Sequence, residues 1–189
     1  MTLPDKNKYF NLAHIEPTTH IYGPGPRYTL WLQGCNLACR GCWNKQMWSH
    51  RPHTLLHRKT LVEQILETKN INGITLLGGE PLQQANNTLW LIEQIRQHSQ
   101  LNILVYTGYE PNEIKEQGVW ERLTDYADLI ISGRYEQSLR NINQQWRGSE
   151  NQQLIYPPNS RLTAQDNSLN EIEIIISEQG AVTTLGYPH

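Results

Sequence analysis

Hydrophobic segments with the character of strands and of helices alternate along this chain. Aromatic and β-branched residues at 27–33 are typical of a strand and follow a turn-rich Gly-Pro-Gly-Pro run. Short apolar runs that predict three further strands lie at 73–77, 101–106 and 127–131. Because strand, loop and helix repeat in this order, we expect right-handed βαβ units and a parallel sheet, and hence an α/β fold.

Three segments between these strands predict helices. Thr60 and Glu63 have the spacing of a capping box, which predicts a helix that starts at Thr60. Apolar residues three and four positions apart predict a second helix over about 84–98. Pro111 suits a first helical turn and predicts a third helix that runs to about residue 123.

The C-terminal part of the chain has a different pattern. Residues 1–157 are expected to form one domain, and residues 158–189 an extension packed on the same domain. Polar and apolar residues alternate at 170–177. A Gln-Gly turn follows at 179–180, and a second apolar run lies at 181–185. This pattern predicts a hairpin. Two interpretations are open, an edge hairpin that covers the sheet or a docking surface for a partner.

Composition and charge mainly exclude partners. The chain has 189 residues, which suits one hydrophobic core. It has 16 basic and 18 acidic side chains and a formal net charge of -2, so we expect no nucleic-acid partner. No apolar run is long enough to predict a membrane span, and the polar residues 1–9 lack the pattern of a signal peptide. The sequence therefore predicts a cytoplasmic protein in a reducing compartment.

All three cysteines lie within eight residues, where Cys35, Cys39 and Cys42 form a C-x3-C-x2-C run. An odd number of thiols cannot form a complete set of disulfides. Three thiolates on one loop can instead bind three irons of a cubane 4Fe–4S cluster, and with no fourth cysteine one iron would be open to a non-protein ligand. The alternatives are a redox-inert cysteine cluster and a zinc site completed by a histidine.

Other unusual motifs lie where the predicted strands end. They are Gly-Gly-Glu-Pro at 78–81, Thr-Gly-Tyr at 107–109 and Ser-Gly-Arg at 132–134. Because the carboxyl ends of parallel strands meet at one edge of a sheet, we expect these motifs and the cysteines to share one site. The glycines at 78 and 79 allow close approach of a ligand, and Glu80 supplies an acceptor that suits an ammonium group.

The cysteine spacing and the strand that ends in Gly-Gly-Glu-Pro resemble the radical S-adenosylmethionine superfamily. Within it, the chain is most similar to the glycyl-radical activases of anaerobic ribonucleotide reductase. The segments that carry this resemblance are 23–30, 34–44, 105–109, 132–135 and 146–152. The resemblance implies a partial, open parallel β/α barrel of about five or six strands.

The same resemblance implies roles for individual residues. The cysteines would bind a 4Fe–4S cluster, and the amino and carboxylate groups of S-adenosylmethionine would bind the open iron. The residues expected to contact this cofactor are Gly78, Gly79, Glu80, Pro81, Thr107, Arg134 and Trp43. Gly78, Gly79 and Glu80 would hold the methionine amino group, and Thr107 and Arg134 would lie near the ribose and the carboxylate. Trp43 and Tyr109 lie at the same edge and could flank the adenosine or the substrate. Ser132 stands where many relatives carry an acid, so that acid's contact with the cofactor is not expected here.

The implied activity is reductive cleavage of S-adenosylmethionine to a 5′-deoxyadenosyl radical, which abstracts hydrogen from a protein or peptide substrate. A flavodoxin or ferredoxin would donate the electron, and an accessory protein could take part. Two alternative functions are open. One is a maturase that modifies the backbone of a ribosomally made peptide with a separate partner protein, and the other is a non-catalytic iron–sulfur carrier.

Overall fold

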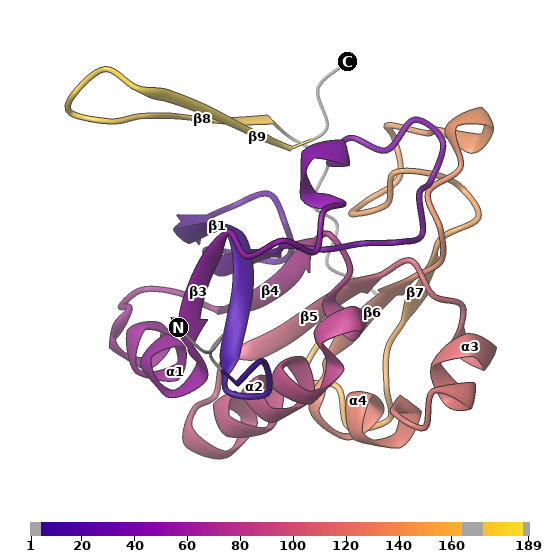
Figure 1. Ribbon diagram of the computed structural model, residues 1–189, viewed down its shortest axis with the longest axis horizontal. Helices are drawn as coiled ribbons and strands as arrows, with labels where there is room; N and C mark the ends of the chain where they lie inside the picture. The colour runs from indigo at the N-terminus through magenta and orange to yellow at the C-terminus, as the bar shows by residue number, and fades with distance from the viewer. Residues whose placement is uncertain (1–4, 164–171, 187–189) are drawn as a thin grey trace.

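A seven-stranded sheet forms the centre of the protein (Figure 1). The computed structural model describes residues 5–163 and 172–186. The strands lie in the order β3-β1-β2-β4-β5-β6-β7. The four parallel strands are β2 (Arg27–Leu32), β4 (Gly73–Gly78), β5 (Asn102–Thr107) and β6 (Leu129–Ser132). The predicted α/β fold with a mostly parallel sheet is therefore confirmed.

Three strands that the sequence patterns did not indicate complete the sheet. They are β1 (Tyr9–Thr19), β3 (Thr54–His57) and β7 (Gln153–Ile155), and each runs antiparallel to its neighbours. The expected number of five or six strands is therefore too low. β1 is irregular in sequence because Pro17 lies inside it, at a shift in its register with β2.

Four helices connect the parallel strands and pack on one face of the sheet (Figure 1). They are α1 (Arg58–Glu67), α2 (Ala85–His98), α3 (Pro111–Glu116) and α4 (Trp120–Tyr126). Short 3₁₀ turns lie at η1 (Lys45–Met47), η2 (Pro81–Gln84) and η3 (Gln137–Leu139). None of the helices in the described ranges combines the length and apolar character that a membrane span needs.

Two of the predicted helices differ from the structure, one in its first residue and one in being divided. α1 begins at Arg58 rather than Thr60, because the His57 side chain caps it by accepting a hydrogen bond from the amide of Lys59 (3.3 Å). The single helix expected over 111–123 is two helices, α3 and α4. Gly118 lies between them with a left-handed φ of 69°, which ends α3.

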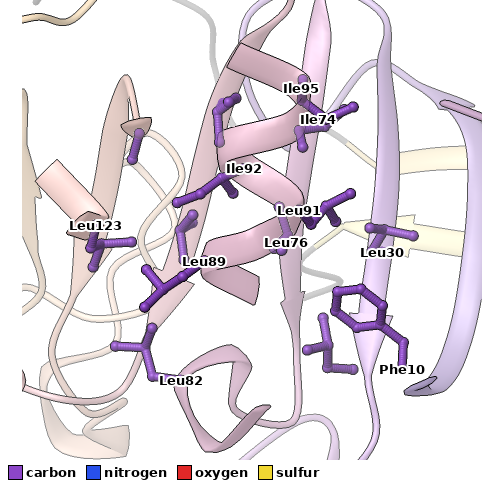
Figure 2. Close-up of a cluster of buried hydrophobic side chains, with 14 of the residues drawn as sticks. Phe10, Leu30, Ile74, Leu76, Leu82, Leu89, Leu91, Ile92, Ile95 and Leu123 are labelled. Carbon is purple, nitrogen blue, oxygen red and sulfur yellow. The ribbon is translucent and has the colours of Figure 1, made fainter. Parts of the chain in front are cut away.

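The main hydrophobic core lies between the sheet and the helices (Figure 2). Leu30, Ile74 and Leu76 alternate along β2 and β4 and point to the helical face, where Ile92 and Ile95 of α2 meet them. Each of these side chains is buried, and burying one such aliphatic side chain contributes about 1.5–3 kcal/mol. This packing fixes the positions of the strand ends.

Loops rather than helices cover the opposite face of the sheet. There Trp31 and Leu77 pack with Tyr22 and Leu185, and Trp146 is buried in a cluster beside them. These side chains come from segments far apart in the sequence, so the periodicity of single elements does not reveal them. The covering loops leave a cavity at the carboxyl edge of the sheet.

The C-terminal hairpin is formed by β8 (Ile172–Ile176) and β9 (Val182–Gly186), which pair antiparallel as a separate two-stranded sheet. The edge strands of the seven-stranded sheet are β3 and β7. The interpretation of this hairpin as an edge of the main sheet is therefore wrong. Residues 170–171 of the predicted segment lie outside the described residues. The domain limits at 157 and 158 stay a prediction.

Candidate functional site

The ends of the parallel strands surround a cavity of about 180 Å³. The predicted site residues that line it are Cys35, Cys39, Cys42, Trp43, Gly78, Gly79, Glu80, Pro81 and Thr107. Arg134 does not line this cavity and lies beside Cys39 in an adjoining groove. The structure therefore brings the predicted residues together except for Arg134, and their roles toward a cofactor stay predictions.

The cysteine loop is fixed to the sheet by backbone hydrogen bonds. The amides of Gly34 and Cys35 donate to the carbonyls of Met47 (2.8 Å) and Trp48 (3.1 Å). The carbonyl of Gly34 accepts a hydrogen bond from the amide of Glu80 (2.9 Å). The cysteine loop and the Gly-Gly-Glu-Pro turn are therefore held directly against each other.

The three cysteines are free thiols, and all are partly exposed. Burial raises the pKa of the Cys35 and Cys39 thiols, and the charge of Glu80 raises that of Cys35 further. Such thiols lose their protons when a metal binds. Soft thiolates are the ligands that iron–sulfur clusters take, so this donor set fits a 4Fe–4S cluster. In the described part of the chain, no three His, Cys, Asp or Glu side chains are grouped so as to ligate a single metal ion.

The glycines at 78 and 79 allow two segments of the protein to lie in close contact. Gly78 has a φ of 105°, and a Cβ there would lie 2.7 Å from the amide nitrogen of Leu32. A Cβ on Gly79 would lie 2.5 Å from the carbonyl oxygen of Gly34. A larger residue at Gly78 would push β2 away from β4, and one at Gly79 would push the cysteine loop away from the turn after β4. The sequence indicated close approach of a ligand at these glycines, and the structure shows close approach of protein backbone, β2 at Gly78 and the cysteine loop at Gly79.

Glu80 is a buried carboxyl group at the wall of the cavity, with 1% of the residue exposed. Its Oε1 accepts hydrogen bonds from the amide of Leu82 (2.9 Å) and the hydroxyl of Thr107 (2.9 Å), and its Oε2 accepts one from the amide of Gly108 (2.8 Å). Burial raises the pKa of Glu80 to about 7, although these hydrogen bonds oppose the shift. The site therefore holds a carboxylate that a cationic group in the cavity would stabilise.

Thr107 and Arg134 are both engaged with other protein groups. Besides donating to Glu80, the Thr107 hydroxyl accepts a hydrogen bond from the amide of Tyr109 (3.1 Å). The Arg134 guanidinium donates to both carboxylate oxygens of Glu113 in α3 (2.7 and 2.8 Å). Hydrogen bonding from Arg134 lowers the pKa of Glu113 to about 2. Thr107 thus orients Glu80, and Arg134 ties the turn after β6 to α3.

Comparison with known proteins agrees with this arrangement. Residues 21–155 match the family described as the 4Fe-4S single cluster domain. The anaerobic ribonucleoside-triphosphate reductase-activating protein of Pasteurella multocida is 33% identical over 153 residues, which cover 77% of this chain and 96% of that protein. The chain belongs to this family of activating proteins. The resemblance to glycyl-radical activases is thereby confirmed.

Further relatives give the same result. The activating protein of Enterobacteria phage T4 is 34% identical over 76% of this chain and 92% of its own length. That of Escherichia coli K12 is 33% identical over 75% of this chain and 96% of its own length. Among solved structures, QueE from Escherichia coli superposes with a TM-score of 0.39 and 15% identity, over 58% of this chain and 62% of its own.

The Trp-Arg-Gly-Ser-Glu-Asn-Gln run at 146–152 has a structural role in this activating protein that its sequence did not reveal. The Gln152 side chain donates to the carbonyl of Gly133 (2.9 Å) and accepts from the amide of Gly148 (2.8 Å). The Asn151 side chain donates to the carbonyl of Arg134 (2.8 Å). These amides hold the turn after β6 at the cavity. Their spacing alone could not indicate this, because the partners lie on a different segment.

Several residues of the cavity wall were missed by sequence reasoning. They are Tyr22, Trp31, Leu37, Tyr106, Tyr135, Gly148 and Gln152, among others. Most are aromatic or apolar, so nothing distinguishes them in sequence from residues of the core. Their side chains give the cavity a largely apolar wall, within which the polar groups of the site are concentrated.

The raised pKa of Glu80 predicts a pH-dependent stability for the protein. A carboxyl group with a pKa of about 4.5 unfolded and about 7 folded favours the folded state at low pH, and this contribution is lost as the pH rises through 7. We expect Glu80 to lower the free energy of unfolding by about 2–3 kcal/mol between pH 5 and pH 8. Denaturant titrations of the wild type and of Glu80→Gln at several pH values measure this, because the variant lacks the contribution of Glu80 to the change of the unfolding free energy with pH. The same change with pH in both proteins would contradict the raised pKa of Glu80.

Proposed function

We propose that this activating protein holds a 4Fe–4S cluster on Cys35, Cys39 and Cys42 and S-adenosylmethionine in the adjoining cavity, and that it introduces a radical into anaerobic ribonucleotide reductase. The observation that carries the proposal is the shared wall of one cavity, which joins the three thiols to the carboxyl group of Glu80. When bound and reduced, the cluster would supply the electron that cleaves S-adenosylmethionine, and the resulting radical would take hydrogen from a glycine of the reductase.

The residues around the cavity fit the methionine end of S-adenosylmethionine. Glu80 would accept a charge-assisted hydrogen bond from the amino group, and Thr107 would keep the Glu80 carboxylate oriented. Trp43 is partly exposed at the wall and would flank the adenosine. Arg134 would act from outside, since its guanidinium binds Glu113 and lies beside Cys39 rather than in the cavity.

A polypeptide substrate and a protein electron donor both need access to this end of the sheet. The proposed partial barrel, open on one side, would let a backbone segment of the substrate reach the cavity. The exposed surface around Cys39 and Cys42 carries the basic residues Arg40, Lys45 and Arg140, which outnumber the acidic Glu136 beside them. This positive charge supports an acidic donor such as a flavodoxin or ferredoxin, which would dock close to the cluster.

Two measurements test the proposal. The reconstituted protein with dithionite and S-adenosylmethionine should release 5′-deoxyadenosine, and Cys39→Ala should release none above background. With the anaerobic reductase of the same organism added, electron paramagnetic resonance should show a glycyl radical on the reductase. A fully loaded cluster that yields no 5′-deoxyadenosine would favour an iron–sulfur carrier. Cleavage that leaves the reductase unchanged but alters the mass of a small precursor peptide would favour a maturase.

A further inference from the structure

The C-terminal hairpin presents an apolar face to solvent. Ile172, Ile174 and Ile176 alternate along β8 on this face with 44%, 62% and 69% of each residue exposed. Val182 of β9 pairs directly with Ile176 and is 62% exposed. We call these four residues the hairpin apolar face. Adjacent exposed aliphatic side chains on a small antiparallel sheet are typical of an interaction surface.

The other face of the hairpin is attached to the body of the protein. Leu185 is buried in the cluster that includes Trp31, and Ile175 packs against the same cluster. The amide of Gly186 donates to the hydroxyl of Tyr22 (2.8 Å). The carboxylate of Glu173 accepts a hydrogen bond from the amide of His20 (3.1 Å). The hairpin therefore has one face held by the protein and one face that the described residues leave exposed.

The attachment lies at the cavity of the candidate site. Gly186 and Tyr22, which are hydrogen-bonded to each other, both line the cavity that holds the three cysteines. From there the hairpin extends beyond the body of the sheet (Figure 1). A ligand too large for the cavity would therefore contact the hairpin with the part that stays outside the cavity.

We infer that the hairpin apolar face docks the polypeptide substrate and so directs its target glycine to the cavity; this inference rests on the proposed function. The partner it fits is an apolar surface of the reductase, because the four residues carry no charge. Hydrophobic burial would supply affinity, and the cavity would supply the position of the reacting backbone.

The size of this face favours the substrate over a second copy of this chain. Stable protein interfaces use about 20–30 residues on each side, whereas this face has four. It is therefore too small to hold a dimer by itself, but it can add to a larger contact around the cavity. The family match ends at residue 155, before the hairpin, so this element lies outside the part that defines the family. The choice of the substrate as partner therefore rests on the position of the hairpin at the cavity, and not on the family match.

The test replaces the apolar face while keeping the hairpin. Ile174→Thr, Ile176→Thr and Val182→Thr, combined in one variant, retain β-branched side chains that favour strands and remove most of the apolar surface. The matched control is Ile174→Val with Ile176→Val, which keeps the surface apolar. Both are made as reconstituted holoenzymes. Binding to the purified anaerobic reductase of the same organism is measured by biolayer interferometry, and cleavage of S-adenosylmethionine without reductase is measured in parallel.

We expect the threonine variant to bind the reductase at least tenfold more weakly, and the valine control to bind it within about twofold of the wild type. Cleavage without reductase should be unchanged in both variants, because none of these residues lines the cavity. Unchanged binding of the reductase by the threonine variant would overturn the inference. So would a wild-type dimer, seen by light scattering, that dissociates in this variant while reductase binding stays the same. A wild type that cleaves S-adenosylmethionine and does not bind the reductase would instead overturn the proposed function itself.

Discussion

Replacing any one of Cys35, Cys39 or Cys42 with alanine is expected to abolish loading of the iron–sulfur cluster. The chain has three cysteines in all, so no other thiolate can take the place of the one removed. A cluster held by two thiolates would have two irons without a protein ligand, and such a cluster is lost readily. The measurement is the iron and sulfide content of anaerobically reconstituted protein, together with its visible absorbance. We expect both to fall to background in each of the three variants.

The matched control for this prediction is Asn36→Ala. Asn36 is exposed on the same loop and is no candidate ligand, and its side chain accepts a hydrogen bond from the side chain of Gln83. We therefore expect this variant to load a full cluster. If a single cysteine variant kept the visible absorbance of the wild type, that cysteine would not be a ligand. Loss of the cluster in Asn36→Ala as well would indicate that the loop is fragile, and would remove the specificity of the cysteine results.

The parallel part of the sheet could be predicted because each of its strands has a recognisable hydrophobic pattern within its own segment of the sequence. β4 and β6 are almost entirely buried, and a strand buried on both faces appears as a short apolar run. β1 has no such hydrophobic pattern. It is a long antiparallel strand with mixed burial, interrupted at Pro17, and only its partners β2 and β3 define it as a strand. Pairing partners are a tertiary property, so a pattern confined to one segment could not indicate it.

In the candidate site too, some features could be predicted from the sequence and others depend on tertiary contacts. Cys35, Glu80 and the glycines at 78 and 79 were found because their chemistry is unusual at that spacing and because parallel strands bring their carboxyl ends together. Thr107 was predicted to lie near the ribose and the carboxylate of the cofactor, and this stays a prediction. Its hydrogen bond to Glu80 was not visible in the sequence, which showed only a hydroxyl at a strand end. Arg134 was placed near the cofactor from its motif. Its pairing with Glu113 depends on how α3 packs, and this was not visible in sequence.

Replacing Glu80 with glutamine is expected to weaken S-adenosylmethionine binding without loss of the cluster. The carboxylate is buried, and in the proposed complex it accepts a hydrogen bond from the amino group of the positively charged cofactor. Removing one member of a buried, hydrogen-bonded charge pair costs about 2–5 kcal/mol, so affinity should fall by a factor of about 30 or more. Equilibrium binding of S-adenosylmethionine to the reconstituted variant measures this, and its iron content shows that the cluster is retained. Glu121→Gln, at an exposed position in α4, is the control and should bind like the wild type.

The pH dependence of the same binding separates a direct role of the Glu80 charge from a general disturbance of the site. Because burial places the pKa of Glu80 at about 7 without ligand, most molecules carry a protonated Glu80 at pH 6 and must release that proton before the carboxylate can accept a hydrogen bond from the amino group. The amino group of the cofactor titrates in the same pH range, so the wild type is compared at each pH with Glu80→Gln, in which only the cofactor titrates. The ratio of wild-type affinity to variant affinity should be about tenfold lower at pH 6 than at pH 8. A ratio that is the same at every pH would show that Glu80 only shapes the cavity, whereas a ratio that rises with pH would establish that its charge holds the cofactor.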